Sequence, residues 1–132
     1  MTRVKKAAVP PQPTANDERG EHELTLAGTV YVLRPSHTAL KAIEKQTGVS
    51  TLALIRTGNT GEMTLEQLGI VAAELIRAGA QDELTRHVGA ERIGEFIFEE
   101  GIGPAMARIT LCLFDAATGG RDTAGNVKAA AA

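Results

Sequence analysis

Large aromatic side chains are scarce in this chain of 132 residues, which has no tryptophan, one tyrosine and three phenylalanines. It also has no uninterrupted apolar run of eighteen or more residues, which argues against a membrane-spanning helix. Apolar residues nevertheless make up 43% of the chain, close to the average of globular proteins. The length suits one domain, because domains of about 100–150 residues are the most common. We therefore expect a single folded domain with a core of leucine, isoleucine and alanine.

A strong excess of one charge is also absent, since 14 basic residues stand against 16 acidic ones. Proteins that bind nucleic acid through bulk charge usually have a strongly basic surface, so this class is not favoured. The one cysteine, Cys112, cannot form an intramolecular disulfide and lies in an apolar stretch, which suits a reducing compartment. Residues 9–13 (VPPQP) stand where a signal peptide needs its apolar segment. We expect a cytoplasmic protein.

Charge and composition divide the chain into three parts. Residues 1–15 contain three basic groups, no acidic group and three prolines, a composition that cannot bury enough apolar surface to offset chain entropy. Residues 119–132, which are rich in glycine and alanine, show no apolar periodicity. The remaining residues, 16–118, carry 9 basic and 15 acidic side chains. The sequence therefore predicts a disordered basic arm (1–15), one acidic domain (16–118) and a flexible tail (119–132).

The domain is expected to open with a β-hairpin. Apolar and polar residues alternate over 21–26 and over 29–34, and Ala27-Gly28 between them supplies a two-residue turn. Pairing across this turn places Leu26 opposite Thr29, and Glu21 opposite Arg34 as a cross-strand ion pair of modest value. Because an isolated hairpin is only marginally stable, its apolar face (Leu24, Leu26, Tyr31 and Leu33) must rest on helices.

Helices are expected over most of the remaining domain. Ser36 and Ser50 are N-cap residues, Thr64 and Gln67 form a capping box, and Gly48 and Gly79 are helix ends. Two shorter helices are expected near 81–88 and 90–100, and a last helix from Pro104 to about Thr118. The predicted fold is therefore α+β and mostly α, with one two-stranded antiparallel hairpin packed on five or six helices.

A search for reactive groups gives no catalytic, cofactor or metal site. Residues 101–106 begin like a dinucleotide fingerprint, but Met106 stands at the third glycine position and no parallel strand precedes it. The three histidines have no ligand spacing relative to one another or to Cys112. Cys112 lies in the middle of a predicted helix without an adjacent histidine, so buried packing is favoured over a nucleophile. We expect no enzyme activity, no cofactor and no metal.

One helix carries a stripe of acidic residues. Glu91, Glu95 and Glu99 follow one another at four-residue spacing, with Glu100 beside them and Phe98 on the same side. Like charges at this spacing repel slightly, which a purely structural helix does not require. A solvated helix face is the commoner explanation of such a pattern. The alternative is an acidic docking surface for a basic partner, with Phe98 as an apolar anchor.

The N-terminal half has a more specific pattern. It contains NDERGE at 16–21, YVLRP at 31–35, ALKAIE at 39–44, TGVS at 47–50, MTL at 63–65 and LIRAG at 75–79. This series resembles the gene-transfer-agent family of small tailed-phage proteins, which are encoded between the tail tube and tape-measure genes. The resemblance covers residues 16–79, about half of the chain, and its motifs are structural rather than chemical.

The resemblance implies a function that the residues alone do not. Proteins of this family are regarded as tail assembly chaperones, which hold the tail tube and tape-measure proteins soluble until the tube polymerises. Some are instead described as tail tube components, although a tube subunit would need long strands and only one short hairpin is expected here. A small regulatory protein that uses its basic arm on nucleic acid is a third reading. We expect a chaperone, with a structural tail component as the alternative. The sequence leaves open whether it forms a homo-oligomer, because rings and dimers both fit a chaperone.

Overall fold

The computed structural model describes residues 14–17 and 20–127, so most of the predicted arm (1–13) and the last five residues (128–132) lie outside the described part. The hairpin is β1 (His22–Leu26) and β2 (Thr29–Leu33), paired antiparallel. The helices are α2 (His37–Thr47), α3 (Thr51–Asn59), α4 (Leu65–Gly79), the short 3-10 helix η2 (Thr85–His87), α5 (Ala90–Glu100) and α6 (Ile102–Thr118).

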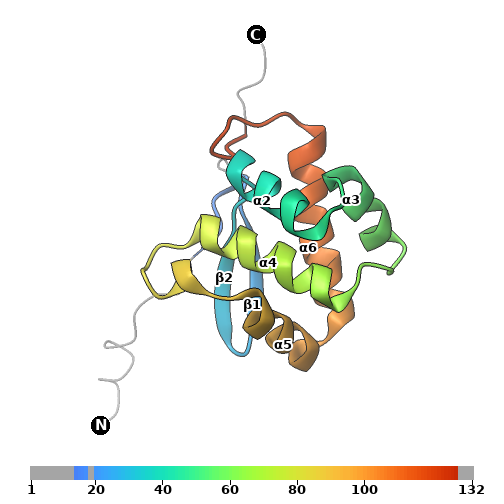
Figure 1. The fold of residues 1–132 in the computed structure, drawn as a ribbon. Coiled ribbons are helices and arrows are strands. Elements are labelled where there is room, and N and C mark those ends of the chain that lie inside the picture. The colour runs from blue at the N-terminus through green and yellow to red at the C-terminus, as the bar shows by residue number, and fades with distance from the viewer. Residues whose placement is uncertain (1–13, 18–19, 128–132) are drawn as a thin grey trace.

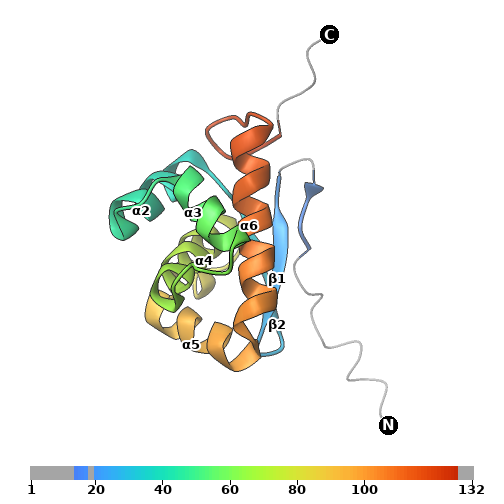
Figure 2. The same cartoon turned by 90° about the vertical axis from the view of Figure 1, so that its right-hand side faces the viewer.

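The predicted fold class is confirmed, because one two-stranded hairpin packs on five α-helices in the described residues. Helix α4 lies at the centre and contacts α2, α5, α6 and strand β2 (Figure 1). Helix α6 packs between α3 and β1, and Figure 2 shows the hairpin on one side of α6 with the other helices on the opposite side. The hairpin therefore covers one face of a helical layer, as its apolar pattern requires.

The predicted register of the hairpin is confirmed. Leu26 pairs with Thr29 and His22 with Leu33, so the two strands are joined by a two-residue turn. Both turn residues have left-handed backbones, with φ of 52° at Ala27 and 78° at Gly28. Such a turn matches the right-handed twist of the strands. The N–H of Ala27 donates a hydrogen bond to Oε1 of Glu100 (3.0 Å), which ties the turn to the end of α5.

The predicted N-cap residues of the helices before residue 80 are confirmed, but the segment that follows residue 80 differs from the prediction. Ser36 and Ser50 accept the expected capping hydrogen bonds, and Thr64 and Gln67 form both bonds of a capping box. The helix predicted over 81–88 is wrong, because this segment contains only the 3-10 turn η2. The Asp82 carboxylate accepts hydrogen bonds from the backbone and hydroxyl of Thr85, and such local bonds compete with helix formation.

The core is aliphatic, as the composition predicts. Its largest fully buried side chains come from both strands and all five α-helices; they are Leu26, Leu33, Ile43, Leu54, Leu68, Val71, Leu75, Ile76, Ile93, Ile97, Ile109 and Leu113. Tyr31 and Phe96 pack only against its edge. Phe98 and Phe114 are exposed large hydrophobic residues instead. The fold thus closes its core without placing any phenylalanine in it.

A buried ion pair joins the two ends of the described chain. Nη1 of Arg34 lies 2.8 Å from Oε2 of Glu21, and the two side chains are only 10% and 3% exposed. The same guanidinium donates from Nε to the Ala124 carbonyl (2.8 Å) and from Nη2 to Oδ1 of Asn126 (2.9 Å). The cross-strand ion pair that the sequence predicts is therefore present, and it is buried.

These contacts also extend the folded domain beyond residue 118, where the sequence predicts its end. The sequence places that end at residue 118 and a flexible tail beyond it, but residues 119–127 fold back on the base of the hairpin. Arg121 pairs with Val127 in an isolated bridge, and the His37 N–H donates to the Thr123 carbonyl (2.9 Å). Gly125 packs against the backbone of Pro35. Residues 128–132 of the predicted tail lie outside the described part.

We predict that Arg34→Gln lowers the free energy of unfolding by about 3–5 kcal/mol, because removing one member of a buried ion pair is strongly destabilising. The matched control is Arg86→Gln, which removes an ion pair between side chains that are 51% and 78% exposed. Exposed pairs contribute about 0–1 kcal/mol. Urea unfolding followed by circular dichroism measures both changes, and equal losses in the two variants would contradict the role assigned to Arg34.

Candidate functional site: an acidic groove between α4 and α5

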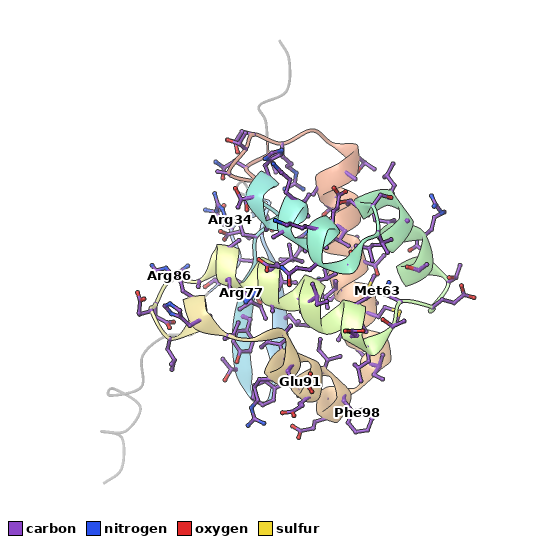
Figure 3. All side chains as sticks on the ribbon, viewed as in Figure 1. Arg34, Met63, Arg77, Arg86, Glu91 and Phe98 are labelled. Carbon is purple, nitrogen blue, oxygen red and sulfur yellow. The ribbon has the colours of Figure 1, made fainter. Side chains whose placement is uncertain are left out.

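A groove of about 770 Å³ runs between the N-terminal half of α4 and the outward side of α5. Its wall combines four carboxylates with apolar side chains; the lining residues are Leu65, Glu66, Ile70, Ala90, Glu91, Gly94, Glu95, Phe98 and Glu99. Figure 3 shows Glu91 and Phe98 on α5, at the lower edge of the molecule. We call this site the acidic groove, because none of its lining residues is basic.

Two glycines bring the helices that form the groove into direct contact. A Cβ atom on Gly69 of α4 would lie 2.7 Å from the Ala90 carbonyl oxygen, so this position cannot hold a side chain without movement. Gly94 of α5 faces it, and a Cβ there would lie 3.8 Å from the Gly69 Cα. Glycine inside a helix is unfavourable by about 1 kcal/mol relative to alanine, and close backbone approach is the usual reason for it.

The carboxylates of the groove differ in what they contact. Oε1 of Glu95 lies 2.8 Å from Nη1 of Arg92, whose guanidinium also lies 4.6 Å from the centre of the Phe96 ring. The side chains of Glu91 and Glu99 make no hydrogen bond or ion pair with another residue of the described ranges 14–17 and 20–127. Glu91 lies in the first turn of α5, where the helix dipole favours negative charge. Glu99 lies at the opposite end, which has no basic residue in its last turn.

Glu100 does not belong to this site. Its carboxylate accepts the hydrogen bond from Ala27 N–H in the hairpin turn and does not line the groove. The sequence places Glu100 beside the other three glutamates because it follows Glu99 directly. In the fold, however, it holds the hairpin against the C-terminal end of α5. The predicted set of five residues is thus divided into four that line the groove and one that positions a neighbouring element.

The apolar part of the groove comes from both helices. Phe98 is 65% exposed, and Leu65, the first residue of α4, is 39% exposed. Ile70 lines the groove between them. Sequence reasoning found Phe98 but missed the wall on α4, including Glu66, because the pairing of α4 with α5 is a tertiary contact. The glycines inside both predicted helices were the available signal, since each marks a site of close approach.

No second constellation of reactive groups appears in the part of the chain that the structure describes. No three histidine, cysteine or acidic side chains come together there in a way that would hold a metal ion. Nε2 of His22 lies 2.9 Å from Oδ2 of Asp115, which joins β1 to α6. Burial raises the pKa of the Cys112 thiol to about 12, so this side chain is held as the unreactive thiol. None of the helices in the described ranges is long and apolar enough to cross a bilayer.

We predict that Gly69→Ala destabilises the protein although it raises helix propensity. The added methyl group meets the Ala90 carbonyl, and overpacking of this kind lowers stability by about 1–3 kcal/mol, more than the roughly 1 kcal/mol gained in propensity. Gly94→Ala is the control, because its methyl group enters ordinary van der Waals contact. Thermal unfolding should show a lower Tm for the first variant and an equal or higher Tm for the second. A lower Tm for Gly94→Ala than for Gly69→Ala would contradict the close contact between Gly69 and the Ala90 carbonyl.

We also predict that Cys112 does not react with 5,5′-dithiobis(2-nitrobenzoate) in the folded protein at pH 8. The folded thiol has its pKa near 12, whereas an unfolded thiol has its pKa near 8.5. Above pH 9 the unfolded chain loses this proton while the folded chain keeps it, so this group lowers stability as pH rises. One equivalent of thiol should react in 6 M guanidinium chloride. Fast stoichiometric reaction without denaturant would show that the thiol is accessible.

Comparisons with known proteins add no assignment to this geometry. No protein-family model, no curated protein and no solved structure matches the chain. The case for a function therefore rests on the acidic groove, on the fold that builds it and on the motif resemblance over residues 16–79.

Proposed function

We propose that this chain is a non-enzymatic tail assembly chaperone of a tailed phage or gene transfer agent, acting in the cytoplasm of the bacterial host. In this role it binds the tail tube protein or the tape-measure protein before the tail polymerises. The observation that carries the proposal is the acidic groove, a surface that combines four carboxylates with the exposed apolar side chains of Leu65 and Phe98. Exposed apolar surface with a polar rim is typical of protein-binding sites.

The chemistry of the groove indicates what kind of segment it would bind. Leu65, Ile70 and Phe98 offer apolar contact, while Glu66 and the glutamates of α5 flank them. A basic amphipathic helix matches both features, because its apolar side chains would cover the floor and its lysines or arginines would face the carboxylates. Phe98 is the natural anchor, since aromatic residues at the centre of an interface often contribute most of the binding energy.

The motif resemblance supports the same proposal from other residues. Where the structure describes them, the matching segments build the two strand ends at the hairpin base (16–17, 20–21 and 31–35), part of α2 (39–44) and the connection to α3 (47–50). The segments at 63–65 and 75–79 lie at the two ends of α4. They form the frame that supports the groove, and one of their residues, Leu65, also lines it. A structural tail component remains the alternative outcome. It is less favoured because the strands in the described part have five residues each, whereas a tube wall requires long strands.

We predict that the double variant Glu95→Lys/Glu99→Lys weakens binding to the tail partner by about tenfold or more, because like charges placed across an interface are costly. The control is Glu62→Lys/Glu83→Lys, which changes the net charge equally on exposed residues outside the groove. Co-expression with the neighbouring tail tube and tape-measure proteins, pull-down and titration of the purified complex measure the effect. Thermal unfolding checks that both variants fold.

Three results would contradict the proposal. The first is that the chain binds neither tail protein. The second is that the groove variant Glu95→Lys/Glu99→Lys binds as tightly as the control variant. The third is that mass spectrometry finds the chain in abundance in finished particles. The last result would favour the structural tail component, because a chaperone leaves the assembly when the tube is complete.

A further inference from the structure

We propose that residues 1–13 of the basic arm, the part outside the described residues, dock in the acidic groove of their own molecule and compete there with external ligands. The inference goes beyond the proposed function, since it needs no phage partner and would hold for any basic ligand of the groove. It rests on three observations: where the described chain begins, how far the arm can reach, and how the charges of the two parts match.

The described chain begins beside the segment that leads to the groove. Thr14 lines a second groove of about 620 Å³ together with residues of β2 and of the α4–α5 connection, including Asp82 and Thr85. Two hydrogen bonds fix the following residues: Ala15 N–H donates to Oε2 of Glu23 (2.9 Å) and Asn16 N–H donates to Oε1 of Glu21 (2.9 Å). The described chain therefore begins at the groove that Thr85 also lines.

The length of the arm is of the same order as the path from Thr14 to the acidic groove. Thr85 and Glu91, which lines the groove, are six residues apart, so no more than about 21 Å separates them. Thr14 shares its groove with Thr85. Lys6 stands eight residues before Thr14 and can extend up to about 28 Å from it. Lys5 and Arg3 stand nine and eleven residues before Thr14, so their maximum reach is longer.

Charge and polarity of the arm complement those of the groove. The arm carries Arg3, Lys5 and Lys6 and no acidic residue, with Val4 and Val9 as apolar side chains. The groove offers four carboxylates and no basic side chain among its lining residues. Arm and groove belong to one chain, so the local concentration of the arm is on the order of millimolar. Weak individual contacts are sufficient for docking at that concentration, and an incoming ligand must displace the arm.

The first experiment compares the full chain with the full-length variant Arg3→Gln/Lys5→Gln/Lys6→Gln by ¹⁵N–¹H correlation NMR. Docking predicts amide shift differences concentrated at groove residues such as Ile70, Gly94 and Phe98, independent of protein concentration. The differences should disappear in 0.5 M NaCl, where the Debye length falls to a few ångströms. Differences that grow with protein concentration would place the arm in a neighbouring molecule, and no difference at the groove would exclude docking; both overturn the proposal.

The second experiment measures competition with a fluorescent peptide that has the sequence of residues 1–13. The peptide should bind the variant Arg3→Gln/Lys5→Gln/Lys6→Gln, here called the arm-neutralised chain, about tenfold more tightly than it binds the unaltered chain. The reason is that the native arm occupies the groove at millimolar effective concentration. A peptide with glutamine at its three basic positions is the control and should not bind. Equal affinity for the two chains would overturn the proposal. The proposal would also be overturned if the peptide bound with unchanged affinity to an arm-neutralised chain that also carries Glu95→Gln/Glu99→Gln. Neither experiment contains a tail protein, so their failure would leave the chaperone proposal standing.

Discussion

The buried ion pair between Glu21 and Arg34 is the contact that the rest of the structure depends on. Charges removed from water require a partner of good geometry, and Arg34 meets this need with Glu21, the Ala124 carbonyl and Asn126 at once. The pair also fixes the strand register, because a slip of one residue would separate the two charges and turn the apolar face of the hairpin to solvent. The two ends of the hairpin and residues 124–126, about ninety residues later in the chain, are thereby held together.

From that base, a series of short contacts determines where the acidic groove lies. The register sets the position of the Ala27 turn, whose N–H binds Glu100 and so holds the C-terminal end of α5. Gly69 and Gly94 then set how closely α5 approaches α4. The groove is the space left along this contact, where Leu65 and Phe98 extend past the two backbones. Its shape thus follows from the hairpin, the turn and two glycines rather than from a loop.

Local signals account for what the sequence predicts correctly. Ser36, Ser50 and the Thr64–Gln67 capping box act within a few residues, and the hairpin register follows from a two-residue turn. Contacts between distant residues account for what it misses. Residues 119–127 have no apolar periodicity and are positioned by Arg34, about ninety residues away. The wall of the groove on α4 is also missed for this reason, since Gly69 signals a close approach to α4 but does not show that α5 is the helix that approaches.

The proposed docking role of the acidic groove depends on the single sign of charge among its lining residues. An exposed apolar floor on its own would favour association between copies of the chain. Two copies meeting through this groove would bring four carboxylates from each into contact without a basic lining residue to offset them. The same carboxylates attract a segment rich in lysine or arginine, whether from a partner or from residues 1–13. The four carboxylates therefore disfavour self-association through the groove, while Phe98, which is 65% exposed, stays available to a basic ligand.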